Sequence, residues 1–302
     1  MNKFQANLCL ISVTICWSTE VILLRNIPSD VPGFAVVAMT NLLGALLIAL
    51  VFCRRISFKI PKKALLKLAA LSVLNVGYNA LLTYGLRNMD ITSGAFTFSM
   101  TIVIVPIVLF SSRKHVSLQT WAGTGLIFLG IMIALGPSVF DLGMMALLAM
   151  LGACILRAIY IVLLNELAKE AEPSQVVVIM LVMVAAVSAL LWVITAPETI
   201  TSISYDANLL ASVFIYSLFI CAIANVFNIF PQKVASAEAT AIIYSLEIVF
   251  TTLFAAILPD MLVERAIPTI PVVIGCALVC VGNIVSSYDF AALKERRLSR
   301  EH

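Results

Sequence analysis

Ten long apolar runs constrain what this chain can fold into more than any other feature of its sequence. Each run is free of charge clusters and approaches the roughly 20 residues that a helix needs to cross about 30 Å of hydrocarbon. A closed β-barrel would instead need alternating segments of about ten residues, so the runs predict helices. We therefore expect an all-α integral membrane protein with ten transmembrane helices. The runs cover residues 5–25, 32–53, 64–86, 91–111, 119–136, 142–165, 174–196, 208–230, 237–258 and 268–287.

The composition leaves little room for anything else. Of 302 residues, 62% are hydrophobic and 12% charged, which is too little polar surface to cover a soluble globule. No phosphate-binding G-x-x-x-x-G-K-[S/T] motif occurs, both histidines (His115 and His302) lie outside the apolar runs, and the seven cysteines suit small apolar core residues. We expect no enzymatic activity, no cofactor and no metal site. An intramembrane enzyme with a glutamate as acid or base, and a channel or receptor, are the alternatives from other classes.

Basic residues are distributed unevenly over the loops between the expected helices. Sorted by alternate loops, 15 of the 19 lysines and arginines fall on one side and three on the other, while Arg157 lies inside a helix. The first side includes both termini and the basic tail, residues 289–302. By the positive-inside rule this side faces the cytoplasm. We expect a multi-pass protein of the cytoplasmic membrane, its tail near anionic lipid headgroups, and no nucleic-acid partner.

Two segments recur in each half of the chain. Residues 79–101 align without gaps on residues 225–247, and residues 121–131 align on residues 273–283. The two matches occur in the same order and at the same place in each half, which indicates a duplication of five helices. The expected units are residues 1–138, residues 139–288 and the tail 289–302.

The number of helices in each unit determines how the two units lie in the membrane. Because five is odd, the second unit enters the membrane with the opposite orientation. The loop charges agree, since Arg113 and Lys114 follow the fourth expected helix whereas Asp260 and Glu264 follow the ninth. Inverted repeats of this kind are typical of secondary transporters, which expose one central site alternately to the two sides.

Three segments carry a resemblance to a known family. TSGAFTFSMTIVIVP (residues 92–106), AEATAIIYSLEIVF (237–250) and CWSTEVILLR (16–25) resemble the EamA family of the drug/metabolite transporter superfamily. The resemblance implies ten helices, cytoplasmic termini, and a central cavity lined by the first, third, fourth, sixth, eighth and ninth. One departure is the sequence Leu246-Glu247-Ile248 where the family has Leu-Glu-Pro, so the proline kink expected there is absent.

Charged side chains inside the expected helices are the first candidates for a site. Glu20, Arg157 and Glu247 lie within apolar runs, and Glu238 lies near the start of one. A charge at the bilayer centre costs about 2.5–3.5 kcal/mol on insertion scales, so each should face a cavity or a partner. Two carboxylates against one guanidinium leave one negative charge for a cation or a proton. A buried ion pair that fixes helix registry and a substrate site both remain open.

Neutral polar residues follow helical spacing in the third, eighth and ninth expected helices, which predicts wet faces towards a cavity. Interhelical hydrogen bonds are the alternative for any single residue. Tyr78 and Trp17 are aromatic candidates for stacking against a substrate. The candidate substrate-binding set is Glu20, Arg157, Glu247, Asn79, Asn225, Asn228, Tyr244, Tyr78 and Trp17.

These residues predict a secondary transporter that moves a small polar metabolite by alternating access. An amino acid or related zwitterion fits when Glu20 or Glu247 faces its ammonium and Arg157 its carboxylate. The alternative is an exporter of cationic amines or drugs that uses the net negative charge without contacting Arg157. Glu20 is also the candidate for proton coupling, because a carboxylate that alternates between water and a sealed site can bind and release a proton.

Overall fold

The computed structural model describes residues 1–25, 27–28, 30–53, 61–89, 91–136, 143–258 and 267–287, and all its regular elements there are helices. The predicted unit boundary at 138/139, the acidic loop with Asp260 and Glu264, and the tail 289–302 lie outside these residues. The helices are α1 (Lys3–Ser18), α2 (Glu20–Arg25), α3 (Gly33–Phe52), α4 (Lys62–Arg87), α5 (Ile91–Phe98), α6 (Thr101–Ser111), α7 (Leu118–Leu135), α8 (Met144–Glu170), α9 (Pro173–Thr195), α10 (Thr199–Ser202), α11 (Ala207–Tyr216), the π-helix η2 (Ser217–Ile223), α12 (Ala224–Ile229), the 3₁₀ helix η3 (Phe230–Lys233), α13 (Ala237–Tyr244), α14 (Leu246–Ile257) and α15 (Ile270–Ser287).

Eight helical stretches in the described part of the chain are long and apolar enough to cross a membrane. They are residues 33–52, 62–87, 93–111, 118–135, 144–170, 173–195, 207–233 and 237–257. The first expected span is instead divided at Thr19 into α1 and α2, and α15 provides a shorter apolar helix. The all-helical prediction is therefore confirmed, and eight of the ten expected spans meet the length and hydropathy of a crossing helix.

Local sequence explains where several helices begin and end. Asn2, Ser117, Asp206 and Ser236 cap α1, α7, α11 and α13, because each side chain accepts a hydrogen bond from a backbone N–H of the first turn. At the other end of α7, Gly136 has a φ of 54°, a conformation that glycine adopts readily.

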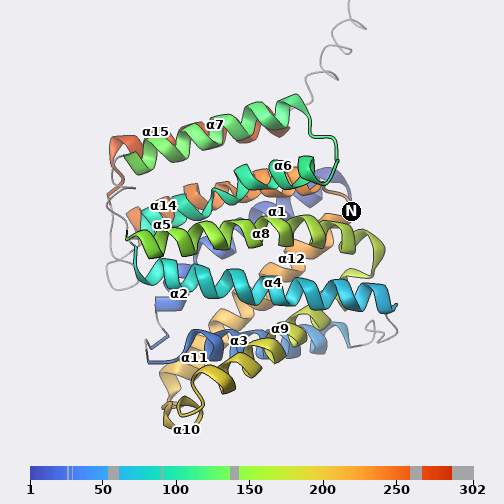
Figure 1. Cartoon of the computed structure of the whole chain (residues 1–302), viewed down its shortest axis with the longest axis vertical. Helices are drawn as coiled ribbons and strands as arrows, with labels where there is room; N and C mark the ends of the chain where they lie inside the picture. The colour runs from blue at the N-terminus through green and yellow to red at the C-terminus, as the bar shows by residue number, and fades with distance from the viewer. Residues whose placement is uncertain are drawn as a thin grey trace, which may run out of the picture.

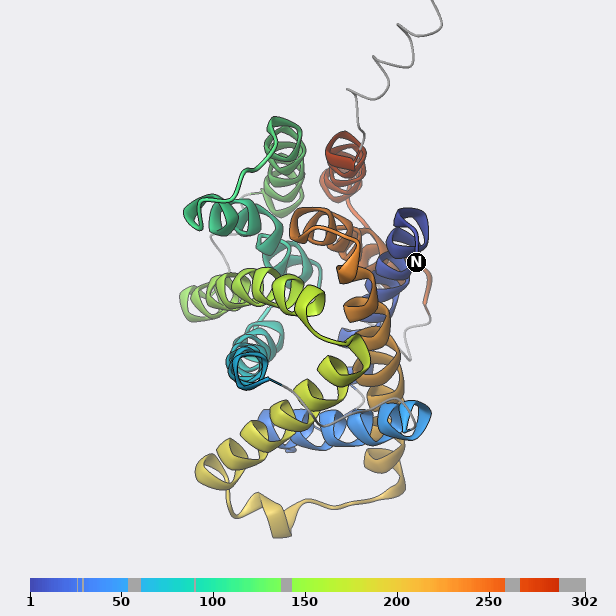
Figure 2. The same cartoon turned by 90° about the vertical axis from the view of Figure 1, so that its right-hand side faces the viewer.

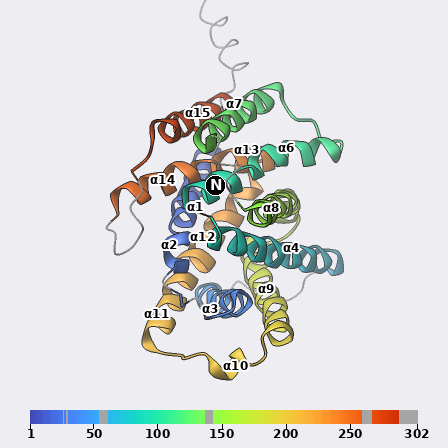
Figure 3. The same ribbon diagram turned by 60° about the vertical axis from the view of Figure 1, so that its left-hand side comes forward.

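The helices form two paired edges with a central group between them (Figures 1 and 3). The pair α7 and α15 lies at one edge, and the pair α3 and α9 lies at the opposite edge. Between the edges, α4 packs against α8 and α1 packs against α12. Figure 2, turned by 90°, views α4 nearly end-on and shows α9 crossing α3.

The α7–α15 pair depends on glycines at its contact. A Cβ added at Gly123 would lie 2.5 Å from the carbonyl oxygen of Gly282, and one added at Gly275 would lie 2.6 Å from that of Gly130. Such distances are too short for any side chain. Small residues let helix backbones approach closely in lipid, where apolar side chains gain nothing by leaving the hydrocarbon. The glycines that align in the two halves therefore fix this edge.

Three of the expected spans are interrupted near their middle. The interruptions lie at Thr19, at Ser99 and Met100, and at Ser245. Thr19, Ser99 and Ser245 each donate a side-chain hydrogen bond to a carbonyl three or four residues earlier, a contact that often bends helices. The span that contains Leu246-Glu247-Ile248 is thus broken at Ser245 without the family's proline.

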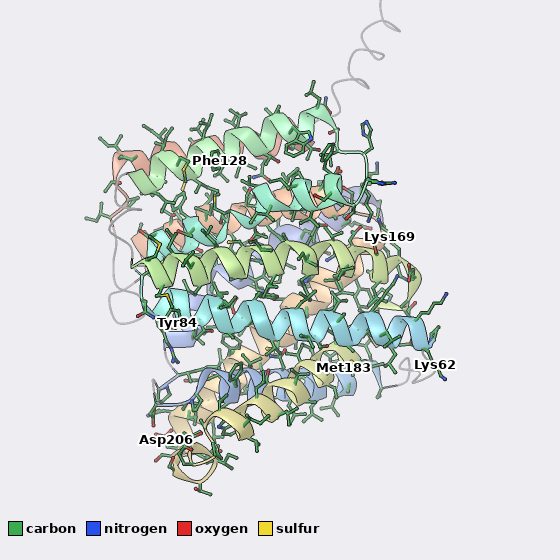
Figure 4. The ribbon with its side chains drawn as sticks, viewed as in Figure 1. Lys62, Tyr84, Phe128, Lys169, Met183 and Asp206 are labelled. Atoms are coloured by element: carbon green, nitrogen blue, oxygen red, sulfur yellow. The ribbon has the colours of Figure 1, made fainter. Side chains whose placement is uncertain are left out.

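Three ion pairs close one end of the molecule. At the last turn of α8 and just beyond it, Glu166, Glu170 and Glu172 pair with lysines of three other segments, which are Lys114, Lys67 and Lys233 respectively. We call this the lysine-rich end. Figure 4 shows Lys62 and Lys169 at this end and Tyr84 and Asp206 at the opposite one.

Candidate substrate cavity

A cavity of about 930 Å³, counted with its open mouth, occupies half the length of the molecule. It extends from Gly33 and Arg87, at the end opposite the lysine-rich end, to Arg157. Arg157 lies thirteen residues from either end of α8, so the cavity reaches the middle of the protein. Beyond it, towards the lysine-rich end, the interior is packed with side chains such as Leu68 and Leu164, which have no exposed surface. The cavity is open at one end and closed at the other.

Seven of the nine predicted site residues line this cavity: Trp17, Glu20, Tyr78, Asn79, Arg157, Asn225 and Asn228. The other two, Tyr244 and Glu247, do not. They line a smaller hollow of about 220 Å³, to which Arg157 also contributes. Arg157 therefore lies between the two spaces and lines both of them.

Glu20 faces the cavity from the first turn of α2. Because the chain breaks at Thr19, this carboxylate lies at the N-terminus of a half-helix, where the helix dipole favours negative charge. The hydroxyl of Tyr216 donates a hydrogen bond of 2.6 Å to its Oε1. Among the side chains that the structure describes, no ammonium or guanidinium lies within ion-pairing distance of Glu20. Its charge is available to a ligand in the cavity.

Arg157 is engaged by other residues of the protein. Its Nη2 donates to Oε2 of Glu247 at 3.0 Å, and only 7% of the residue is exposed. The centroids of the Phe98, Trp17 and Tyr244 rings lie 4.3, 5.0 and 5.7 Å from its Cζ. Aromatic faces stabilise a cation at these distances. Of the two ion pairs left open by the sequence, the one with Glu247 forms.

Glu247 mirrors Glu20 in one respect and differs in another. It too lies in the first turn of a half-helix, α14, which begins after the break at Ser245. Its carboxylate, however, is paired with Arg157 and has a side-chain exposure of 19%. The backbone carbonyl of Glu247 also accepts a hydrogen bond of 3.1 Å from Ser18, which joins α14 to α1.

Each of the three predicted asparagines makes a hydrogen bond within the protein, and Asn228 is the most buried of them. Asn228 is 1% exposed, and its Oδ1 accepts hydrogen bonds from Tyr244 and from Gln232, at 2.9 Å for the latter. Asn79 donates to Oδ1 of Asn75 at 2.9 Å, and Asn225 donates to a backbone carbonyl of η2. The amide stripes of the third and eighth expected spans therefore face the cavity, as predicted, with Asn228 serving as a buried acceptor.

Aromatic rings form pairs around the cavity floor. Trp17 meets Tyr244 edge to face at a centroid distance of 4.9 Å, and Tyr78 meets Tyr160 at 5.5 Å. Such pairs add stability beyond their buried area. Trp17 therefore links the cavity to the smaller hollow in which Tyr244 lies.

Tyr216 was missed by sequence reasoning, and the backbone explains why. The polar stripe predicted in the eighth expected helix consists of Cys221, Asn225, Asn228 and Gln232 and assumes α-helical spacing. That spacing does not place a residue five positions before Cys221 on the same face. The π-helix η2, with its i to i+5 hydrogen bonds, brings Tyr216 and Cys221 to the same cavity wall. No pattern in the sequence marked this insertion.

The set of lining helices also differs from what the resemblance implied. The second expected span, α3, contributes Val36, Val37, Thr40 and Asn41 to the cavity. The ninth, α13 and α14, lines only the smaller hollow. The resemblance implied that the ninth span lines the main cavity, and for this cavity that expectation is wrong. The guanidinium of Arg157, which pairs with Glu247 and lies near the ring of Tyr244, stands between the cavity and the ninth span.

Comparisons with known proteins agree with the fold. Residues 5–136 match the EamA-like transporter family, which is consistent with the drug/metabolite transporter superfamily and confirms the resemblance drawn from the sequence. No curated protein matches. Among solved structures, 29 chains match. One, a crystal structure titled only as that of a protein, covers 93% of this chain and 98% of its own, with a TM-score of 0.74 and 20% identity. At that identity the likeness shows the shared fold alone.

Proposed function

We infer that this chain, whose residues 5–136 match a family of membrane transporters, moves a small molecule with a protonated amino group across the membrane. The observation that carries this inference is that the two carboxylates inside the spans, Glu20 and Glu247, have different partners. Glu247 is neutralised by Arg157, whereas Glu20 faces the cavity with a neutral phenol as its partner. A cation that enters the cavity therefore meets one available negative charge, and the aromatic side chains Trp17 and Tyr78 beside it suit an ammonium group.

The geometry favours a cationic amine over an amino acid held by Arg157. That guanidinium has its hydrogen-bonding edge on Glu247 and its faces near aromatic rings, so a substrate carboxylate would have to displace Glu247. An amino acid or related zwitterion is the second candidate because Arg87 lines the mouth of the same cavity. Its carboxylate would then lie towards Arg87 while its ammonium lies at Glu20.

Alternating access between two inverted five-helix units is the proposed mechanism. Ser99 and Ser245, which align in the two units, both lie at helix breaks. Gly123 and Gly130 align on Gly275 and Gly282, and the contacts are reciprocal, since Gly123 meets Gly282 and Gly130 meets Gly275. Reciprocal contacts are expected of two units related by a twofold axis. Both features support the units 1–138 and 139–288, and hence a total of ten helices.

The lysine-rich end is proposed to face the cytoplasm. It holds the N-terminus and the lysines of the side rich in basic residues, and it is sealed by ion pairs. With this orientation in the cytoplasmic membrane, the cavity opens to the outside, and the basic tail 289–302 belongs to the cytoplasmic side. Glu20 can then take up a proton or an ammonium from outside water, which supports a role in proton coupling.

Ligand-induced stabilisation of the purified protein tests the proposal. Methylamine and larger amines should raise the unfolding temperature with the logarithm of their concentration above the dissociation constant, and Glu20→Gln should remove this response. The matched control is Glu170→Gln, which changes a carboxylate at the closed end. Stabilisation by amino acids but not by amines would favour the zwitterion. Absence of any response to either class, with Glu20→Gln unchanged from wild type, would contradict the proposal.

A further inference from the structure

A second hollow of about 630 Å³ lies between the start of α3 and the last two turns of α4. Four of its lining residues, Gly33, Val37, Thr83 and Arg87, also line the central cavity. The two spaces are therefore adjacent and share one wall. We refer to this hollow as the α3–α4 groove; Figure 4 marks Tyr84, another of its lining residues, on α4.

The α3–α4 groove reaches the outer side of the protein as well as the mouth of the cavity. Ala80, Tyr84 and Arg87 follow one another at spacings of four and three, so they share one face of α4. Ala80 lies seven residues before the end of α4, which is about 10 Å along the helix axis. Tyr84 is 47% exposed on the outer surface of the protein. The groove thus extends from the cavity mouth to a depth at which the surrounding medium is hydrocarbon.

Its lining suits an apolar group. Phe34 and Val37 of α3 face Ala80 of α4 across the hollow, while Tyr84 and Arg87 stand nearer the helix end. Along α4, Tyr78 beside the central cavity floor and Tyr84 in the groove are six residues, or about 9 Å, apart. A ligand about 9 Å long therefore reaches from the level of Tyr78 to that of Tyr84 along α4.

We propose that the α3–α4 groove binds the apolar part of an amphipathic amine whose ammonium lies at Glu20. The inference rests on the proposed function and names its substrate class. The occupant follows from the adjacency of the two spaces, since one of them holds the carboxylate of Glu20 and the other has a mostly apolar lining that reaches the outer surface at Tyr84. Substrate then exchanges with the outer leaflet of the membrane as well as with water.

A series of straight-chain amines from methylamine to octylamine tests whether the groove binds an alkyl chain, because it shows how affinity depends on chain length. Each methylene that leaves water for the groove should improve the apparent affinity about fourfold, until the groove is filled. Ala80→Phe fills the groove and should abolish this gain for the long amines while leaving methylamine unaffected. Val73→Phe is the matched control, because Val73 lies on the same helix and is 59% exposed. Thermal stabilisation of the full-length protein in one fixed detergent is the readout.

A second variant keeps the proposal testable if Ala80→Phe fails to fold. Tyr84→Ala widens the groove and should extend the gain to longer amines than wild type accommodates. An unchanged chain-length dependence in both variants would overturn the proposal. Equal stabilisation by octanol, independent of Glu20, would show that the groove takes an apolar chain without an ammonium and would also overturn the proposal.

The outcomes separate this inference from the proposed function. If methylamine stabilises the protein through Glu20 but chain length has no effect, only the proposed role of the groove is wrong. If no amine of any length stabilises the protein and Glu20→Gln changes nothing, the proposed function itself fails.

Discussion

Glu20 and Glu247 are both glutamates in similar backbone settings, yet their carboxylates have different partners. Each occupies the first turn of a half-helix that follows an interrupted span. Glu247 meets Arg157 at 3.0 Å beneath aromatic rings, whereas Glu20 accepts a hydrogen bond from Tyr216 and has no cationic partner among the described side chains. A carboxylate inside a span acquires its role from the partner that the fold brings to it, here a guanidinium for Glu247 and a phenol beside an open cavity for Glu20.

The largest expected effect concerns transport driven by a pH gradient. Glu20→Gln keeps a similar shape but cannot bind or release a proton, so it should abolish pH-driven accumulation of an amine in proteoliposomes. Equilibrium exchange of the same amine should remain measurable at raised concentration. If Glu20→Gln accumulates the amine as well as wild type, Glu20 is not the coupling site and Glu247 becomes the candidate.

The next prediction concerns stability, which should depend on the ion pair between Glu247 and Arg157. Arg157→Gln leaves the carboxylate of Glu247 buried without its cation, which should lower the free energy of unfolding by about 3–5 kcal/mol. The double variant Arg157→Gln with Glu247→Gln should recover most of that loss, because no unpaired charge remains. Chemical unfolding in detergent measures both, with Glu20→Gln as the control of smaller effect. Equal destabilisation by Glu20→Gln and Arg157→Gln would remove the distinction between the two carboxylates.

A smaller effect is expected from the phenol beside Glu20. Tyr216→Phe removes the 2.6 Å hydrogen bond that orients the carboxylate and should weaken methylamine binding about tenfold or more, in keeping with about 1.5–3 kcal/mol for hydrogen bonds to charged groups. Tyr244→Phe is the matched control, because Tyr244 donates to Asn228 rather than to a carboxylate. Titration calorimetry compares the two variants, and equal losses in both would argue against orientation of Glu20 by Tyr216.

The smallest effect should come from the exposed ion pairs. Lys67 and Glu170 have side-chain exposures of 34% and 55%, and surface pairs of this kind contribute about 0–1 kcal/mol. Lys67→Gln should therefore change the free energy of unfolding by less than about 1 kcal/mol, and high salt should erase the difference from wild type. A loss as large as that of Arg157→Gln, persisting in high salt, would place an unrecognised constraint at the lysine-rich end.

Sequence patterns predicted the parts of this protein that depend on residue type and spacing. Apolar runs identify spans because hydrocarbon demands them, and charges inside spans identify a cavity because their burial is costly. Asn79 and Asn225 were found by helical spacing and do line the cavity.

Other features depend on backbone detail or on competition between partners. Whether Arg157 pairs with Glu20 or with Glu247 depends on where the breaks at Thr19 and Ser245 aim the two half-helices, which spacing alone cannot determine. The contribution of α3 to the cavity arises from packing between distant segments. The side chain of Tyr216 reaches Glu20 next to a π-helix, for which the sequence carries no periodic signal.

The π-helix has a consequence for energetics. By the alignment of the two halves, α4 is the counterpart of residues 208–233, yet α4 is a continuous α-helix while its counterpart contains η2 and η3. If the halves exchange roles during transport, the two end conformations are not mirror images in hydrogen bonding or in backbone strain. Their free energies therefore differ even without substrate or gradient, and the resting protein should favour one orientation of its binding site over the other.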